Sequence, residues 1–468
     1  MEDSPRTSRG VIPILLVAAF VVILNETTMN VALNSIMADF GVTERTAQWL
    51  TTAFMLTMAV VIPITGWLLD RLTTRNVFLT AMGLFSLGTL LCMVAPTFPL
   101  LLFGRVVQAS GTAMMMPLLM TTIMQLVPAG ERGKTMGNIS MVIAVAPAVG
   151  PTLSGFILQV GSWRMIFGVV LPIALAMLAL GFAKLTNVGE KKRTPLDLIS
   201  VPLSVLAFGP LIYGLSVVGA EDVAFWVPML AIGVGLGALL AFAARQLVLQ
   251  GRGAAFLDLR TFTRLPFTVS VLMMAIAMMA LFGTIIMLPL ILQRAFGWEP
   301  VQVGLMMLPG GIAMGLLGPV IGRLYDRVGP RVLVVPASFV VLAVFLFFST
   351  IHLGMPWWAI MLGHVAMSVS FASIFTPLFT LALGSLPRDL YSHGSAVIGA
   401  VQQVAGAAGT ALFVTIFAMQ SAAARPTAAS EAEAMLVGAH WAFLGAGAIW
   451  TAAVIAGFFL RKPAEADD

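Results

Sequence analysis

The chain has 468 residues, of which 59% are hydrophobic and 10% charged, and its formal net charge is +5 at pH 7. Soluble domains average about 25% charged residues, so this composition excludes a soluble protein and indicates that lipid is the main solvent. The basic residues are scattered among apolar runs, which indicates membrane orientation and argues against a nucleic-acid partner. The single cysteine, Cys92, excludes an intrachain disulfide, and the separated histidines indicate no metal site.

Apolar runs of about 20 residues, the length that crosses a membrane as a helix, occur fourteen times along the chain. With both termini in the cytoplasm, most of the 25 Lys and Arg residues fall on cytoplasmic segments, and the positive-inside rule favours that orientation. The N-terminus carries no cleavage-site pattern, so the first run is expected to remain as a span. The predicted spans lie near residues 11–36, 47–70, 77–95, 99–126, 136–159, 165–186, 197–219, 224–247, 267–293, 301–324, 332–350, 356–385, 395–419 and 437–460.

In span 1, Glu26 is the sharpest single candidate for chemistry, because no other acid lies away from the ends of the predicted spans. An ionised acid at a helix centre costs about 2.5–3.5 kcal/mol on insertion scales, so Glu26 should face a cavity, pair with a cation or carry a proton. At about 1.5 Å per residue, Glu26 and Arg105 of span 4 lie at similar depths in the outer half. A proton and a cationic compound could compete for this carboxylate. The alternative is a structural acid satisfied by Arg105 or Asn25.

After span 2 the chain reads GWLLDRLTTR (66–75), and after span 10 it reads GRLYDRVGPR (322–331), with Gly, Leu, Asp and two Arg at matched offsets. Gly66 would let another helix approach closely, and Asp70 could cap the N-terminus of a neighbouring helix. A plain positive-inside turn with a solvated aspartate is the alternative. Duplication at matched offsets favours a breakable latch between two halves.

Two further polar or helix-breaking features lie in spans 4 and 5. Arg105 cannot lose its charge and therefore needs an acceptor, and Gln108 follows one turn later on the same face. Gly150 and Pro151 predict a kink and a close-packing site in span 5, although Gly and Pro are also common in membrane helices without a special role.

The order of the spans indicates an internal repeat. Six spans precede the charged loop at 187–197, six follow the loop at 249–266, and two lie between them. The predicted organisation is an N-terminal six-helix lobe at 1–186, two extra spans with their linkers at 187–266, and a C-terminal six-helix lobe at 267–468.

Together these segments resemble the major facilitator superfamily, and in particular its fourteen-span drug:proton antiporter branch. The segment 66–75 is similar to the loop pattern G-x-L-x-D-R-x-G-R-[KR], with Thr73 in place of the second Gly, which the later copy keeps as Gly329. LLFGRVVQASG (101–111) resembles the pattern R-x-x-Q-G, with Ala109 where Gly is usual.

Spans 5 and 1 carry the other two resemblances. APAVGPTLSG is similar to the antiporter motif G-x-x-x-G-P-x-x-x-G, with Gly150, Pro151 and Gly155 in place and Ala146 replacing the first Gly. LNETTMNVAL resembles L-D-x-T-x-x-N-V-A-L, but Asn25 stands at the position of the Asp and the acid follows as Glu26. That shift turns the acid by about 100° round the helix.

The resemblance implies an all-α membrane protein with the major facilitator fold, in which two six-helix lobes and two extra helices make fourteen spans. It implies that the duplicated segments latch the lobes together on the cytoplasmic side, with the start of span 13 (YSHGSAV) as the receiving helix end. It further implies that Arg105 and Gln108 handle protons or orient substrate, and that the motif in span 5 marks exporters. The implied latch residues are Gly66, Asp70, Arg71, Arg75, Gly322, Asp326, Arg327 and Arg331.

The function that follows is proton-coupled export of hydrophobic drugs that carry a positive or zwitterionic charge, from a bacterial cell across its inner membrane. The LNET form of the span 1 motif resembles lincosamide-type and multidrug exporters. The sequence contains no P-loop or dinucleotide-binding turn, so a proton gradient rather than a cofactor is expected to drive transport. The expected partners are small hydrophobic substrates, protons and the bilayer, and the expected state is a monomer.

Two alternatives remain open at this point. The first is a dedicated exporter of an endogenous lipid, siderophore or antibiotic, which the loop pattern cannot distinguish from a drug exporter. The second is a membrane-embedded enzyme or receptor. An enzyme would need clustered acids, histidines or cysteines at one depth, and the sequence offers only Glu26 there.

Overall fold

The protein is described by a computed structural model that covers residues 10–188, 195, 197–218 and 223–461, without the side chains of Asn30, Glu44, Ala148 and Pro151. The described part contains fourteen helices long and apolar enough to cross a membrane, as predicted. The helices are α1 (Val11–Phe40), α2 (Glu44–Arg71), α3 (Thr74–Val94), α4 (Phe98–Leu126), α5 (Arg132–Val160), α6 (Arg164–Lys184), α7 (Ser200–Val217), α8 (Trp226–Gln250), α9 (Leu265–Arg294), α10 (Pro300–Val328), α11 (Pro330–Phe348), α12 (Trp357–Gly384), α13 (Tyr391–Ala424) and α14 (Glu431–Gly457), with short 3₁₀ turns η2 (Ala129–Glu131), η3 (Leu259–Thr263) and η4 (Arg388–Leu390).

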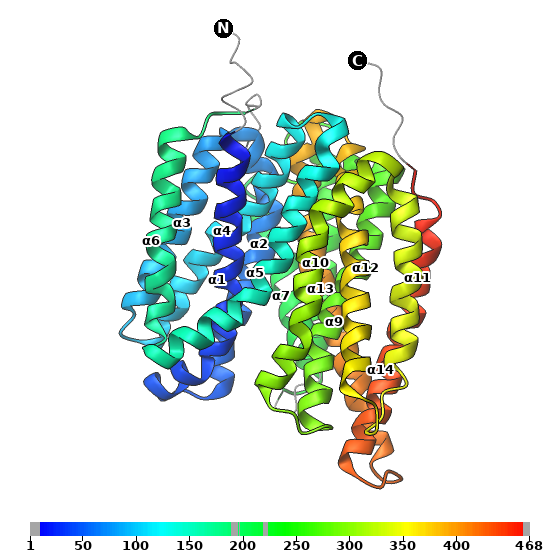
Figure 1. Ribbon diagram of the computed structural model, residues 1–468. Coiled ribbons are helices and arrows are strands. Elements are labelled where there is room, and N and C mark those ends of the chain that lie inside the picture. Colours follow the sequence, from blue (N-terminus) through cyan, green and yellow to red (C-terminus); the bar gives the residue numbers. More distant parts are fainter. Residues whose placement is uncertain (1–9, 189–194, 196, 219–222, 462–468) are drawn as a thin grey trace.

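The helices form two groups that lie side by side (Figure 1). In the first group α3 packs on α4 and α6, and α1 packs on α5; in the second, α9 packs on α13, and α11 packs on α12 and α14. Between the groups, α5 lies against α10 and α2 lies against α13. The described chain begins and ends at the same end of the bundle, here named the terminal end, and the two groups diverge towards the opposite end (Figure 1).

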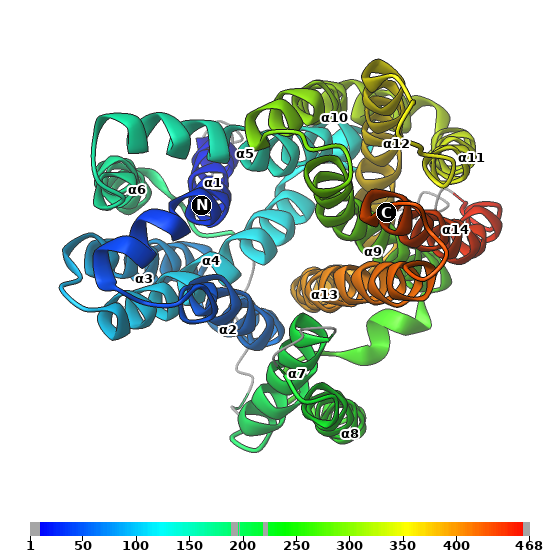
Figure 2. The ribbon, with the colours of Figure 1, turned by 90° about the horizontal axis from the view of Figure 1, so that it is seen from below.

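The extra pair, α7 and α8, pack on each other at the edge of the bundle (Figure 2). Helix α7 also contacts both α2 and α13, one helix from each group. The Ser204 hydroxyl donates to the Val60 carbonyl at 3.4 Å, and the ring of Tyr213 stacks on that of Trp49. The pair therefore covers the seam between the two groups on one side.

Helix ends follow local sequence signals at the terminal end. Thr73, which replaces the second Gly of the loop pattern, caps α3 by accepting a hydrogen bond from the Asn76 amide at 3.2 Å. Its φ of −72° needs no glycine. The corresponding Gly329 has φ +78°, a backbone conformation that residues other than glycine rarely adopt. The two copies of the loop thus begin their following helices in different ways.

The later copy of the charged segment is more helical than predicted. Helix α10 extends to Val328, beyond the predicted end near residue 324, so Asp326 lies in a final helical turn. Helix α2 ends at Arg71, one residue beyond its predicted end, with Asp70 in its last turn. This difference matters because a side chain on a helix has a defined direction, whereas one on a loop does not.

Candidate functional site

A buried polar layer crosses the first group of helices at Arg105, whose side chain is 1% exposed. Its Nη1 donates to Gln108 Oε1 at 2.6 Å and to Asn25 Oδ1 at 3.4 Å. The guanidinium also lies 4.1 Å from the ring centroid of Phe54, a cation–π contact. One cation therefore links α4 to α1 and α2.

The layer continues from α4 into α3. Gln108 Nε2 donates to Thr89 Oγ1 at 2.8 Å, and this hydroxyl donates to the Phe85 carbonyl at 2.6 Å. The helices come this close because Gly88 has no side chain: a Cβ there would collide with the backbone of Gln108. Thr89 and Phe54 were not predicted from the sequence, since a threonine and a phenylalanine in apolar helices carry no distinguishing signal.

The layer is not fully satisfied. Among the described residues, the direct partners of Arg105 are neutral, and the buried atoms Arg105 Nε and Asn25 Nδ2 have no hydrogen-bond partner. Buried polar atoms are usually paired, so this arrangement leaves a buried positive charge with spare donors.

Glu26 lies next to this layer on α1 and is half-buried. Its carboxylate forms no hydrogen bond or ion pair with the residues that the structure describes, yet it lies near enough to Arg105 for the two charges to interact. Glu26 and Arg105 are therefore neighbours without direct contact. Asn25, the residue at the position of the family's Asp, bonds to Arg105 instead.

Helix α5 approaches α1 beside Glu26. A Cβ at Gly150 would collide with Thr27 Oγ1 and would lie 3.3 Å from the Leu24 carbonyl, so a glycine is needed for this close approach. At Gly155 an added Cβ would meet nothing within 4 Å, and that residue makes no comparable approach. The side chain of Pro151 lies outside the described residues, and α5 runs as one helix through this region.

At the terminal end, Asp326 of α10 caps a helix in the other group. Its two carboxylate oxygens accept hydrogen bonds from the amides of Gly133 and Lys134, both at 2.9 Å. These amides belong to the first turn of α5, where unpaired N–H groups and the helix dipole favour a negative charge.

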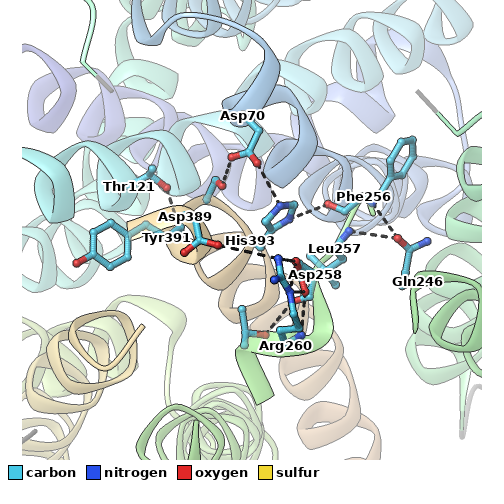
Figure 3. Close-up of polar contacts among 12 residues, drawn as sticks. Asp70, Thr121, Gln246, Phe256, Leu257, Asp258, Arg260, Asp389, Tyr391 and His393 are labelled. Carbon is cyan, nitrogen blue, oxygen red and sulfur yellow. Dashed lines mark hydrogen bonds and ion pairs between the residues drawn. The ribbon is translucent and has the colours of Figure 1, made fainter. Parts of the chain in front are cut away.

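Asp70 of α2 makes the related contact with α13. It is 8% exposed, accepts a hydrogen bond from the Ser392 hydroxyl, and lies 3.3 Å from His393 Nε2 (Figure 3). Helix α13 begins at Tyr391, so Asp70 contacts its first turn, within the segment predicted as the receiving helix end. The contacts described here for Asp70 are to side chains.

Glycines bring the helices of the two groups together at this end. A Cβ at Gly322 would collide with the Gly133 carbonyl, and one at Gly318 would lie 2.6 Å from the Gly137 carbonyl. At Gly66 an added Cβ would lie 3.1 Å from both His393 Nδ1 and the Phe256 carbonyl. The Gly-x-x-x-Gly spacing in α5 and α10 was a signal for close helix packing that the sequence reasoning passed over.

The arginines of the duplicated segments are arranged differently from the aspartates. Arg75 donates to the Phe182 carbonyl in α6 and lies over the Phe182 ring, and Arg331 lies over Phe458. These contacts stay within one group of helices. Arg71 lies over the Trp67 ring on its own helix, and Arg327 lies in the last turn of α10. Long basic side chains at a membrane edge extend along apolar surfaces, which explains why the described contacts of Arg75 and Arg331 do not cross between the groups.

No group of three or more His, Cys, Asp or Glu residues that could hold a metal ion occurs in the part of the chain that the structure describes. The arrangement that remains consists of a buried cation, a neighbouring acid without a direct described partner, and two aspartates that join the helix groups at one end.

The chain is similar to known membrane transporters in sequence and in fold. The family model described as Major Facilitator Superfamily matches residues 15–410. The chain is 38% identical over 465 residues to the MFS-type transporter YcnB of Bacillus subtilis (strain 168), covering 99% of this chain and 97% of that protein. It is 35% identical over 456 residues to the lincomycin resistance protein LmrB of the same organism, covering 96% and 95%. The crystal structure of the human organic anion transporter MFSD10 (TETRAN) matches 96% of this chain and 99% of its own with a TM-score of 0.68 at 14% identity, a likeness of fold alone.

Proposed function

Because the chain belongs to the major facilitator superfamily and is therefore a membrane transporter rather than an enzyme, we propose that it exports drugs in exchange for protons. The proposed substrates are hydrophobic compounds that carry a positive or zwitterionic charge. We further propose a bacterial inner-membrane location with both termini in the cytoplasm, function as a monomer, and the proton gradient as the energy source.

The single observation that carries the proposal is Glu26 beside a buried cation with neutral direct partners. When Glu26 is ionised, its charge offsets that of Arg105, and a cationic compound can enter the neighbourhood. When Glu26 is protonated, Arg105 is left uncompensated, and like-charge repulsion in a medium of low dielectric disfavours a second cation. Proton and cation are thus alternatives, which is the requirement for exchange.

The contacts at the terminal end support an alternating-access cycle. The positive-inside rule places this end in the cytoplasm. The caps from Asp70 and Asp326 join the two lobes there, while the lobes diverge towards the other face (Figure 1). This is the arrangement of an outward-facing state, and export requires these contacts to break so that the cytoplasmic side can open.

The substrate class draws its support from the relatives. One of them, 35% identical over nearly the whole chain, is named a lincomycin resistance protein. Lincomycin is therefore the first probe, and ethidium, a flat hydrophobic cation, is the second.

The experiment uses the purified transporter in proteoliposomes with an imposed pH gradient. We expect Glu26→Gln to lower gradient-driven lincomycin and ethidium transport by about tenfold or more, because the amide cannot bind and release a proton. Transport by the unmodified protein should stop when a protonophore is added. Glu131→Gln, an exposed acid at the cytoplasmic end, is the matched control and should transport normally.

Three results would contradict the proposal. Glu26→Gln transporting at the unmodified rate from about pH 6 to pH 8 would remove Glu26 from the exchange. Transport at the same rate with and without the protonophore would exclude proton coupling. Failure to transport either lincomycin or ethidium would exclude the proposed substrate class.

A further inference from the structure

The chain between α8 and α9 folds back onto the cytoplasmic end of the bundle. After α8, Gly253 adopts φ +63°, and the Leu249 carbonyl accepts the amides of Arg252 and Ala254 at 2.9 and 3.1 Å. This tight turn sends residues 254–263, here named the gate linker, towards α2 and α13. Within the linker, Asp258 accepts from the Arg260 amide at 2.9 Å and begins the turn η3.

One fully buried side chain of α8 holds the backbone of the gate linker. Gln246 Oε1 accepts hydrogen bonds from the amides of Phe256 at 2.8 Å and Leu257 at 3.4 Å. The other end of its amide donates to Ser200 Oγ of α7 at 2.8 Å. Gln246 thus contacts α7 with one end of its side-chain amide and the linker with the other, and Figure 3 shows the contacts with the linker.

Ser200, the partner of Gln246, is held in turn by an ion pair between Asp197, just before α7, and Arg245 of α8. Asp197 accepts the Ser200 hydroxyl at 2.6 Å and two hydrogen bonds from Arg245, at 2.6 and 2.7 Å. The hydrogen bonds from Arg245 hold the pKa of the Asp197 carboxyl well below its usual range, so this contact persists at neutral pH.

The gate linker contacts both lobes beside Asp70. The Phe256 carbonyl lies 3.1 Å from His393 Nδ1, and the opposite nitrogen of that ring faces Asp70. The Phe256 ring packs at 5.9 Å from the Trp67 ring. Further along, Arg260 lies 4.0 Å from Asp389 of η4 (Figure 3).

We propose that the gate linker is a third component of the cytoplasmic gate, and that Gln246 is the positioning residue through which the two additional helices stabilise the closed gate. The inference rests on the proposed function to the extent that closing and opening of this end belong to the transport cycle. It also assigns a role to the two helices that lie outside the six-helix lobes.

The hydrogen bonds of His393 explain how the position of the gate linker affects the stability of the closed gate. A carbonyl oxygen is only an acceptor, so contact with Phe256 requires the hydrogen on Nδ1 and sets the orientation of the ring. The same ring presents Nε2 to the Asp70 carboxylate, which is also only an acceptor, so the two contacts together require a hydrogen on each ring nitrogen. If Gln246 no longer fixes the Phe256 and Leu257 amides, these buried N–H groups lose their acceptor in the closed gate, whereas water can reach them once the lobes separate.

The test measures the gate directly, by spin-label distances in nanodiscs without substrate. Labels are placed at Asn76→Cys in the N-terminal lobe and Arg388→Cys in the C-terminal lobe, in a Cys92→Ala background. We expect Gln246→Met to lower the ratio of closed to open gates by about tenfold, the factor that one unpaired buried amide can produce. The same variant should keep its affinity for lincomycin, because Gln246 lies near the terminal end of α8 whereas Glu26 lies in the middle of α1.

Gln250→Met is the matched control, since Gln250 is one turn further along α8 and makes none of the linker contacts described here. It should leave the distance distribution unchanged. An unchanged distribution for Gln246→Met, or an equal shift for both variants, would overturn the inference.

Hydrogen exchange on the unmodified chain supplies a test that does not depend on the folding of Gln246→Met. The Phe256 and Leu257 amides should exchange slowly when the gate is closed. They should exchange faster in Asp326→Ala, which opens the gate from the α5–α10 side, away from the linker. Equal protection in both proteins would overturn the inference. These readouts involve no proton gradient, so loss of proton coupling would contradict the proposed function while leaving the linker result intact.

Discussion

Arg105 carries a charge that deprotonation does not remove, and it is buried within a membrane-spanning helix, where a charge is unfavourable. Three neutral groups stabilise this charge. The side-chain oxygens of Asn25 and Gln108 accept hydrogen bonds from Nη1, and the Phe54 ring lies against the guanidinium. A guanidinium suits this site because it is flat and delocalised, whereas an ammonium is a compact point charge that prefers water.

The first prediction at this scale follows from that distinction. Arg105→Lys keeps the charge but loses the flat stacking on Phe54 and one of the two amide contacts. We expect a fall of about tenfold in transport rate with normal expression and folding. Arg294→Lys, an exposed arginine at the end of α9, is the control in the same proteoliposome assay. If Arg105→Lys transports normally, charge alone is sufficient at this position.

Sequence reasoning identified part of this residue-scale site. Glu26, Asn25, Arg105 and Gln108 stood out because ionisable and amide side chains are rare in apolar spans, and the structure brings the last three into hydrogen-bond contact. Phe54 could not be found in that way, because its role depends on which face of α2 points at α4.

At the scale of elements, closing of the cytoplasmic end depends on how near two helices can come. Helices α5 and α10 meet through glycines at positions 133, 137, 318 and 322, where added side chains would meet backbone atoms of the facing helix. Backbone carbonyls cannot move aside as side chains can, so these positions tolerate little added volume.

Gly318→Ala should therefore hinder closing of the gate. We expect the spin-label pair at residues 76 and 388 to shift towards longer distances, with a several-fold loss of the closed population. Gly304→Ala on the same helix, where a Cβ meets nothing within 4 Å, should leave the distances unchanged. A normal distance distribution in Gly318→Ala would show that the helices can separate slightly without opening the gate.

The element scale also shows where sequence-based prediction succeeds and where it stops. The fourteen spans were predictable because each has its own apolar run, and the family resemblance predicted the fold. Helix ends were less predictable: α13 begins at Tyr391 rather than near 395, and α10 runs on to Val328. A hydropathy scan does not recognise polar residues in a final helical turn, because it detects only the apolar part of each helix.

On the scale of the whole molecule, ionic contacts hold the additional helix pair together and stabilise the linker that joins it to the C-terminal lobe. Hydrogen bonds from Arg245 lower the pKa of Asp197. Burial raises the pKa of Asp258, but hydrogen bonds from Arg260 outweigh it and the pKa is lowered overall. In the unfolded chain these acids bind a proton near pH 3.9, so the stability that they provide is present above about pH 5 and is lost as pH falls through the lower folded-state values.

A pH-dependent measurement checks this assignment. We expect Asp197→Asn to lower the thermal unfolding midpoint by about 1–3 °C, and by the same amount from about pH 6 to pH 8, because the carboxylate stays ionised throughout. A difference that grew or shrank across this range would show that Asp197 titrates there. A constant difference leaves the pH response of transport to groups inside the membrane, where Glu26 is the proposed carrier.

The described contacts of the two latch aspartates differ, and this difference bears on which substitutions each contact tolerates. Asp326 is received by main-chain amides, which every amino acid except proline supplies, so the facing positions can drift widely as long as no bulk is added. Asp70 is received by a serine hydroxyl and an imidazole, groups that a single codon change can remove. Substitutions that weaken or strengthen the closed cytoplasmic gate should therefore arise more often where α2 meets α13, next to the added helices, than where α5 meets α10.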